Sequence, residues 1–367
     1  MKKRLLIWAP LFFSIYFVGI VTAHFNLFPY HQLLSLKSKI NSSKKPEASL
    51  LKAELNSHFT SPLAKGIKLR YAKVSTIDEL NLKINQLNTP YKNFDSAYEK
   101  ITIKAALVDG NILLVPFEYL SKIDTAYAYI KNKSKTTNEK LGILIIPGSG
   151  INQSSAILQK SKITDNYQCN IDDLVKDYGN CFIQVKPNED FLAIHNGKQK
   201  IEPKSFVNYL LNKGGSYSAH YLIQSLALTK YLKTQYSKTM LCGLSQGGHA
   251  ALLNTLQSNP DYAIIASGYS IRRKEPYMSF HDQLILPNQK IYSPEYIKQK
   301  LQKINTHLLF TYGENEKSTY GLESQKNMTK EYLKEITNIQ FAIHPDAHVY
   351  NKRVILTFCN QHFSSSQ

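Results

Sequence analysis

The residues of this sequence that best fit chemistry by type and spacing are Gly243-Leu244-Ser245-Gln246-Gly247, a serine with glycines two positions before and two after it. A serine held in a tight, strained turn between a strand and a helix needs small residues at those two positions, because larger side chains would collide. Its hydroxyl becomes a nucleophile when a base removes the proton. The pattern therefore predicts Ser245 as a nucleophile, with Gly243 and Gly247 as the glycines of its turn.

A serine nucleophile needs a base and an acid that orients the base, and both residue types follow Ser245 in the chain. The apolar run His307–Tyr312 precedes Gly313-Glu314-Asn315-Glu316, and the run Ile339–His344 precedes Pro345-Asp346-Ala347-His348. Serine, acid and histidine, with the last two on loops after later strands, is the order expected downstream of such a turn. The candidate acids are Glu316 and Glu314, and the candidate bases are His348 and His344.

With these residues the sequence resembles the α/β-hydrolase superfamily, from about Ile101 to the C-terminus. The Gly-Leu-Ser-Gln-Gly-Gly segment is similar to the form common in its carboxylesterase and thioesterase branches. The family acid usually takes the fourth position of a Gly-x-x-Asp segment, which implies Glu316, a glutamate in place of the usual aspartate, with Glu314 as the alternative. The family histidine commonly ends a short loop containing proline, which implies His348; His344 closes a strand and is the alternative.

Acyl transfer also requires an oxyanion hole, in which backbone N–H groups meet the charge that develops on the attacked oxygen. One expected donor is Gln246, directly after the nucleophile, and the second belongs to the loop after Leu141–Ile146. That loop reads Pro147-Gly148-Ser149-Gly150, and Ser149 is the donor expected by position. The same glycines do not make a dinucleotide-binding fingerprint, because Gln153 stands where the third glycine is needed.

The elements that must position these residues alternate along the chain. Asp109-Gly110-Asn111 between two apolar runs predicts a β-hairpin. A helix is predicted over Tyr217–Tyr236 with Ser216 as its N-cap, and a second over His249–Leu256. Short apolar runs bounded by turn residues predict six buried parallel strands, namely Leu141–Ile146, Cys181–Val185, Thr239–Cys242, Tyr262–Ser267, His307–Tyr312 and Ile339–His344. The expected fold is α/β, a mostly parallel sheet of about eight strands with helices on both faces, in one domain of residues 96–367.

The first 23 residues follow a targeting pattern rather than a fold pattern. A basic Lys2-Lys3-Arg4 precedes the uncharged run Leu5–Ala23, which reaches the roughly 17–25 residues that span a bilayer. We expect a hydrophobic helix here that anchors the protein, with the remaining domain on the exported side. A signal peptide cleaved after Val21-Thr22-Ala23 is the alternative and would give a secreted or periplasmic protein. Residues 24–95 are expected to form a stalk or N-terminal extension.

The charge and the cysteines limit the possible partners. The net charge of +18 comes from lysines spread over every segment without a nucleic-acid motif, so we expect no nucleic-acid partner. The four cysteines have no C-x-x-C spacing, so neither a metal nor another cofactor is expected. Cys169 and Cys181 could form a disulfide in an exported domain or stay as two buried thiols.

The function expected from these residues is that of a serine hydrolase cleaving a carboxylic ester, or a thioester or amide, on a small acyl substrate through an acyl-Ser245 intermediate. A peptidase with the same residues and a catalytically silent binding domain are the alternatives. Residues Tyr269–Asn305 leave room for a short cap only. The basic Arg272-Arg273-Lys274 in that segment fits either an anionic substrate group or a solvated edge.

Overall fold

The structure is a computed structural model of the chain, and it describes residues 94–131, 140–150, 153–159, 171–187, 189, 216–269, 293–316 and 323–363. The chain divides into two units, residues 1–57 and 58–367, and every described residue belongs to the second. The predicted anchor or signal peptide (1–23) and the predicted stalk, except Phe94 and Asp95, lie outside the described residues. Within the described part, no helix combines the length and apolar character that crossing a membrane requires.

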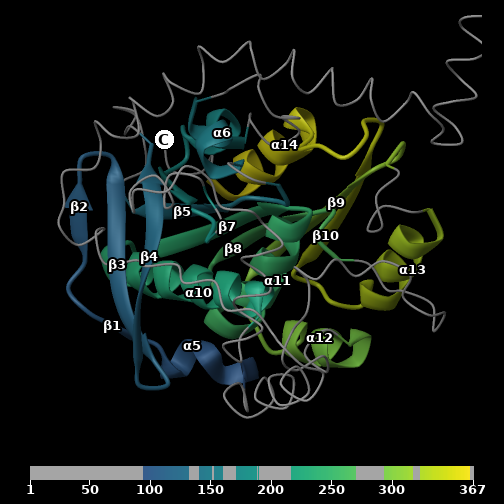
Figure 1. Cartoon of the computed structure of the whole chain (residues 1–367). Coiled ribbons are helices and arrows are strands. Elements are labelled where there is room, and N and C mark those ends of the chain that lie inside the picture. The colour runs from purple at the N-terminus through teal and green to yellow at the C-terminus, as the bar shows by residue number, and fades with distance from the viewer. Residues whose placement is uncertain are drawn as a thin grey trace, which may run out of the picture. The chain divides into compact units, whose positions relative to one another are not determined.

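The described strands form one mixed sheet, which confirms the predicted α/β class (Figure 1). Its order is β1-β3-β4-β6-β5-β7-β8-β9-β10, with β2 paired to β3. From β6 to β10 all neighbours are parallel, whereas β4 meets β6 in antiparallel register. The strands are β1 (Thr102–Ile103), β2 (Leu107–Asp109), β3 (Ile112–Tyr119), β4 (Lys122–Ile130), β5 (Leu141–Ile146), β6 (Asn180–Gln184), β7 (Lys238–Leu244), β8 (Tyr262–Ala266), β9 (His307–Gly313) and β10 (Ile339–His344).

All six predicted parallel strands are present, two of them with the predicted bounds. They form because their apolar runs are buried on both faces: every residue of β5 and β8 is buried. The predicted count of about eight strands is too low, since the sheet has ten strands in its described part. The difference lies in the antiparallel edge: β4 was not predicted, and the first strand of the predicted hairpin is divided into β1 and β2.

The hairpin at Asp109-Gly110-Asn111 is confirmed, because β2 pairs with β3 and Asp109 faces Ile112 across the turn. A second hairpin joins β3 to β4 through Leu120 and Ser121, both with positive φ (50° and 61°). Neither is a glycine, asparagine or aspartate, the residues that usually mark such turns. The sequence therefore gave no turn signal there.

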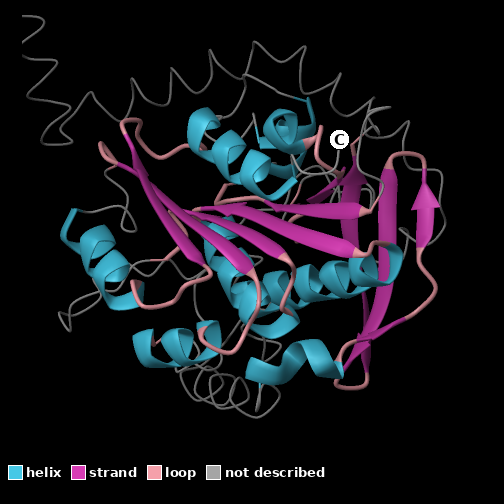
Figure 2. Ribbon diagram, turned by 180° about the vertical axis from the view of Figure 1, so that it is seen from behind, coloured by secondary structure: helices cyan, strands magenta, loops and turns pink. Residues whose placement is uncertain are grey.

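Helices cover both faces of the sheet (Figure 2). On one side α10 contacts α11 and α5, and on the other α7 contacts α6 and α14 (Figure 1). The helices are η2 (a 3-10 turn, Phe94–Ser96), α5 (Ala97–Lys100), α6 (Gln153–Gln159), α7 (Ile171–Val175), α10 (Tyr217–Gln235), α11 (Gln246–Ser258), α12 (Pro294–Leu301), α13 (Glu323–Leu333) and α14 (Lys352–Phe363).

The long helix α10 begins where the sequence predicted, with Ser216 Oγ accepting a hydrogen bond from Ala219 N at 3.1 Å. It is buried on more than one face, because β4 and β5 pack on one side and α11 and α5 on another. Helix α11 begins at Gln246, three residues before the predicted start, so it follows Ser245 directly. The strand-to-helix context expected for the nucleophile is therefore present.

The cysteine alternatives are partly resolved. Cys181, Cys242 and Cys359 are free, buried thiols. Cys169 lies outside the described residues. For Cys181 the buried-thiol alternative is therefore confirmed and the disulfide is not.

Candidate active site

Ser245 sits at the turn between β7 and α11 with φ 58° and ψ −123°. This conformation is rare for a residue with a side chain and costs about 1–3 kcal/mol, so it persists only where the surroundings enforce it. Ser245 N donates to Ala266 O of β8 at 2.9 Å, and Ser245 O accepts from His249 N of α11 at 2.9 Å. The turn is thus held by the neighbouring strand and by its own helix.

The glycines predicted on either side of Ser245 are required by close backbone contacts. A Cβ at Gly243 would lie 2.1 Å from Gly247 O, and a Cβ at Gly247 would lie 2.0 Å from Ile146 O. Both distances are far inside van der Waals contact, so no side chain fits at either position without moving backbone. The second contact also packs the turn directly against the end of β5, where the predicted oxyanion loop begins.

Glu316 and His348 are brought together by the loops that follow β9 and β10. His348 Nδ1 is hydrogen-bonded to Glu316 Oε1. The other carboxylate oxygen accepts from Ser267 Oγ at 2.6 Å and from Gly313 N at 3.3 Å. The Glu316 side chain is fully buried, whereas that of His348 is 24% exposed. An ionised carboxylate can only accept, so this pairing puts the proton on Nδ1 and, in the neutral ring, the lone pair on Nε2.

The two alternative residues occupy different surroundings. The Glu314 side chain is exposed, and its backbone N donates to His344 O at 2.7 Å. The His344 side chain is 2% exposed, with Nδ1 3.9 Å from Asp346 Oδ2, and burial lowers its pKa. Neither alternative takes part in the Glu316–His348 pair. Among the described residues, that hydrogen-bonded pair does not extend from His348 to Ser245; such bonds are often long in proteins without substrate.

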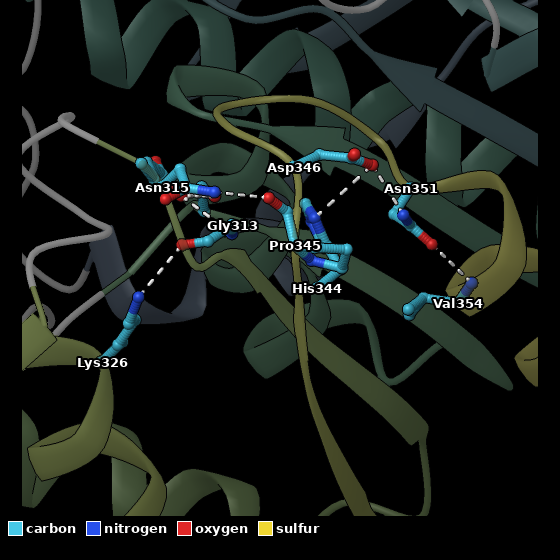
Figure 3. Close-up of polar contacts among 10 residues, drawn as sticks. Gly313, Asn315, Lys326, His344, Pro345, Asp346, Asn351 and Val354 are labelled. Atoms are coloured by element: carbon cyan, nitrogen blue, oxygen red, sulfur yellow. Dashed lines mark hydrogen bonds and ion pairs between the residues drawn. The ribbon is translucent and has the colours of Figure 1, made fainter.

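The loop that carries Glu316, residues 313–316, is fixed to the loop after β10 and to helix α13 (Figure 3). We call it the acid loop. Asn315 Nδ2 donates to Pro345 O at 2.7 Å, and the buried Lys326 of α13 donates to Gly313 O and Glu314 O, each at 3.1 Å. These bonds hold Glu316 and the loop after β10 in one arrangement; we call that loop, residues 345–348, the histidine loop.

The predicted oxyanion loop, residues 147–150, contacts Lys186, which no sequence pattern marks. Lys186 follows β6 and is fully buried. Its Nζ donates to Gly148 O at 2.6 Å, to Gly150 O at 2.9 Å and to Gln246 Oε1 at 3.2 Å. Lys186 therefore joins this loop to the first residue of α11. Burial lowers the pKa of Lys186 to about 7, and the charge of Glu189 acts in the opposite direction.

Glu189 lies three residues after Lys186 and accepts hydrogen bonds from the first turn of α6. Its Oε1 accepts from Ser154 N at 2.9 Å, and its Oε2 accepts from Ser155 Oγ at 3.1 Å. Burial raises the pKa of Glu189, while these hydrogen bonds and Lys186 act to lower it. The carboxylate thereby caps the first turn of α6.

Lys186, Glu189 and Ser267 were missed because a polar residue after a strand is most often a solvated loop residue. Their position relative to the strand ends is the signal that could have identified them. Each directly follows the end of a parallel strand or lies a few residues beyond it, as the acid and histidine loops do. In open α/β sheets this edge is where ligands bind. In the part of the chain that the structure describes, no cluster of three His, Cys, Asp or Glu side chains could hold a metal ion.

No family model matches the sequence, and no curated protein matches it. Solved structures of similar fold include a family 15 glucuronoyl esterase from Caldicellulosiruptor kristjansonii, with a TM-score of 0.47 and 12% identity over 81% of this chain and 88% of the other. A cold-adapted esterase from an Arctic intertidal metagenomic library has a TM-score of 0.42 and 9% identity, over 72% and 98% of the two chains. A peroxisomal α/β-hydrolase from Saccharomyces cerevisiae has a TM-score of 0.40 and 11% identity, over 72% and 88%. Each of these three structures is similar to this chain over most of its own length, with a TM-score below 0.5.

Proposed function

We propose that this protein is a serine hydrolase that cleaves a carboxylic ester through an acyl-Ser245 intermediate. The observation that carries the proposal is the backbone of Ser245, with φ 58° at a strand-to-helix turn. Backbone strain at a residue with a side chain concentrates at functional sites. A turn of this kind exposes the hydroxyl at the carboxyl edge of the sheet.

In the proposed reaction His348 Nε2 takes the proton of Ser245 Oγ while the oxygen attacks the ester carbonyl carbon. Glu316 keeps Nδ1 protonated and stabilises the imidazolium that forms. The tetrahedral intermediate then collapses, and the alcohol leaves with the proton from His348. Water repeats the sequence on the acyl enzyme, again with His348 as base and then acid, and releases the carboxylic acid and Ser245.

The negative charge of each intermediate requires N–H donors, and we assign them to Gln246 and Ser149. Gln246 is the first residue of α11, where N–H groups point away from the helix and the helix dipole favours an anion. Ser149 lies in the loop after β5, and the end of β5 packs against Gly247, two residues after Ser245. Each such donor is typically worth about 10²–10³ in kcat.

The substrate class in this proposal is a small or medium acyl ester. The segment expected to cap the site, Tyr269–Asn305, is short for a lipase lid. Of it, the structure describes Tyr269 and residues 293–305, including α12.

Hydrolysis of a panel of p-nitrophenyl esters of increasing acyl length tests the proposal. We expect turnover by the wild type, and a loss of roughly 10⁴-fold or more in Ser245→Ala, because the nucleophile is removed. Ser258→Ala is the matched control: Ser258 is a buried serine at the other end of α11, bonded to Asn254 Oδ1 at 2.7 Å. We expect it to keep wild-type kcat.

Two outcomes would contradict this function. Equal turnover by wild type and Ser245→Ala would exclude Ser245 as the nucleophile. A folded wild type that hydrolyses no ester would favour a peptidase if it cleaves peptides, or a binding domain if it cleaves neither.

We also propose that residues 1–23 anchor the protein in a membrane with the hydrolase domain on the exported side. The basic start and the uncharged run Leu5–Ala23 support this. Expression of the full chain, followed by membrane extraction and N-terminal sequencing, tests it. A membrane-bound protein beginning at Met1 is expected, a start near His24 would indicate a cleaved signal peptide, and a soluble protein beginning at Met1 would contradict both.

A further inference from the structure

We infer that Lys186 is the positioning residue of the oxyanion hole: its side chain orients the peptide unit between Gly148 and Ser149 and ties that unit to Gln246. This inference rests on the proposed function. The hydrogen bonds of Lys186 go to the oxyanion loop and to the side chain of Gln246 rather than to Ser245, Glu316 or His348. This role accounts for the burial of a lysine at the carboxyl edge of the sheet.

The number of contacts of Lys186 matches the number of its donors. An ammonium group has three N–H bonds and no acceptor. The three acceptors are Gly148 O at 2.6 Å, Gly150 O at 2.9 Å and Gln246 Oε1 at 3.2 Å. The residue is 0% exposed, so these contacts take the place of water. A buried cation with this set of partners fixes the groups around it, because moving any of them leaves charge unsolvated.

The contact with Gly148 determines where the Ser149 N–H points. A trans peptide unit is planar, and its C=O and N–H bonds point in opposite directions. The C=O of Gly148 and the N–H of Ser149 belong to the same unit. When Gly148 O is bound to Lys186, the Ser149 N–H is turned away from Lys186. The flanking glycines permit many conformations, and Gly150 has φ 116°, so the loop needs such a restraint to present one orientation.

The contact with Gln246 couples the two expected donors. Lys186 holds the side chain of Gln246, whose backbone N–H is the other donor, while it holds the carbonyl that fixes the Ser149 N–H. One ammonium group therefore joins the loop after β5 to the start of α11. The donors of an oxyanion hole must be in place before the charge develops. The contacts of Lys186 would hold both donors in place before substrate binds.

Lys186 is itself held in position by α6 and by α10. Its backbone N donates to Ser154 Oγ at 3.1 Å. The rings of Tyr217 and Tyr221 lie with centroids 6.0 and 5.8 Å from Nζ, within cation–π range. Tyr221 OH also donates to Pro147 O at 2.6 Å, so the helix that flanks the ammonium group contacts the same loop.

The arrangement depends on the charge of Lys186. A neutral amine has two N–H bonds and a lone pair. One of the three acceptors would then have no N–H donor and would face the lone pair instead. The ionisable groups around it are Glu189 from its own segment and Tyr217 and Tyr221 from α10; burial keeps Tyr217 neutral by raising its pKa. Because burial lowers the pKa of Lys186, kcat should begin to fall at a lower pH than an ordinary lysine would give.

The test compares Lys186→Met with Lys230→Met. Methionine keeps much of the length and removes the charge. Lys230 of α10 is the matched control, since its Nζ donates to the carbonyls of Tyr98 and Ile101 and lies over the Tyr98 ring, in contact with α5 rather than the site. Active sites are counted by end-point titration with a fluorophosphonate. The readouts are kcat and KM per titrated site and the affinity for a trifluoromethyl ketone, whose serine adduct carries an oxyanion.

For Lys186→Met we expect kcat to fall about 10–100-fold, less than loss of a direct donor, with KM within about threefold. Ketone affinity should fall by a similar factor. Lys230→Met should keep kcat and ketone affinity within about twofold. Unchanged kcat and ketone affinity in titratable Lys186→Met would overturn the inference.

The pH profile gives a second test that does not depend on Lys186→Met folding. In the wild type, the decline of kcat with rising pH should begin below the ordinary lysine range, because burial lowers the pKa of Lys186. In Lys186→Arg the charge persists, so this decline should be absent. A decline of the same size and midpoint in Lys186→Arg would overturn the role of Lys186. Failure of the proposed function would look different, as a wild type with neither turnover nor titratable serine.

Discussion

Two buried lysines hold the two halves of the proposed site, and they do so differently. Lys186 binds two carbonyls of the oxyanion loop and the side chain of Gln246. Lys326 binds two carbonyls of the acid loop, those of Gly313 and Glu314. Both contact backbone oxygens of a loop at the carboxyl edge of the sheet. Lys186 also reaches Gln246, the residue that follows Ser245.

The acid loop has further restraints that are independent of its lysine. Asn315 N donates to Asp346 O at 3.3 Å, its side chain donates to Pro345 O, and Glu316 accepts from Ser267 Oγ. The oxyanion loop is rich in glycine; Tyr221 OH donates to Pro147 O at its start, and the charged Lys186 binds the carbonyls of Gly148 and Gly150. A buried lysine therefore holds a loop at the carboxyl edge of the sheet in both places. In the acid loop it shares this role with other hydrogen bonds, whereas the role inferred for Lys186 is to orient the oxyanion donors.

The largest effect should come from the base itself. His348→Ala should lower kcat roughly 10⁴-fold or more, because no group remains to take the proton of Ser245. His344→Phe is the matched variant: His344 is buried at the end of β10, and its ring does not join the Glu316 pair. Steady-state ester hydrolysis measures both. A larger loss of kcat in folded His344→Phe would reverse the assignment of the base.

Replacing the acid should have the next largest effect. Glu316→Gln keeps the shape but lets the amide donate to Nδ1, which favours the wrong tautomer and should lower kcat by about 10³–10⁴. Glu314→Gln, two residues away with an exposed side chain, should leave kcat within about twofold. If the two variants lose activity equally, the acid loop does not supply the acid through Glu316.

Removing the lysine of the acid loop should have the smallest effect on chemistry. Lys326→Met leaves the buried carbonyl of Gly313 and the partly buried carbonyl of Glu314 without this donor, and it should lower the free energy of unfolding by about 1–3 kcal/mol. Because the other bonds of the acid loop remain, kcat should fall less than about fivefold. Thermal unfolding and ester hydrolysis measure the two quantities. A loss of kcat as large as in Lys186→Met would remove the distinction between the two lysines.

The parts of the fold that sequence predicted are those with a local signal. The run Leu141–Ile146 has the predicted bounds because it is apolar throughout and ends at Pro147. The strand β4 was missed because it begins with Lys122 and Asp124 and follows a turn of Leu120 and Ser121 without glycine. It pairs on one side with β3, the other strand of its hairpin, and on the other side with β6, which follows much later in the chain.

The residues of the candidate site also differ in whether a local sequence pattern marks them. Ser245, Glu316 and His348 could be predicted because each lies in a short pattern with a known chemical purpose. The role of Lys186 could not be predicted, because it depends on three acceptors from two other segments, Gly148 to Gly150 and Gln246. A single lysine after a strand has no local pattern that distinguishes burial from solvation.

The central claim, that Ser245 is the nucleophile, is tested most directly by mapping a covalent adduct. The purified protein is treated with a fluorophosphonate and digested, and the modified peptide is identified by mass spectrometry. We predict one adduct per chain on Ser245, absent from Ser245→Ala and retained in Ser258→Ala. An adduct on a different residue, or equal labelling of Ser245→Ala, would contradict the proposed function.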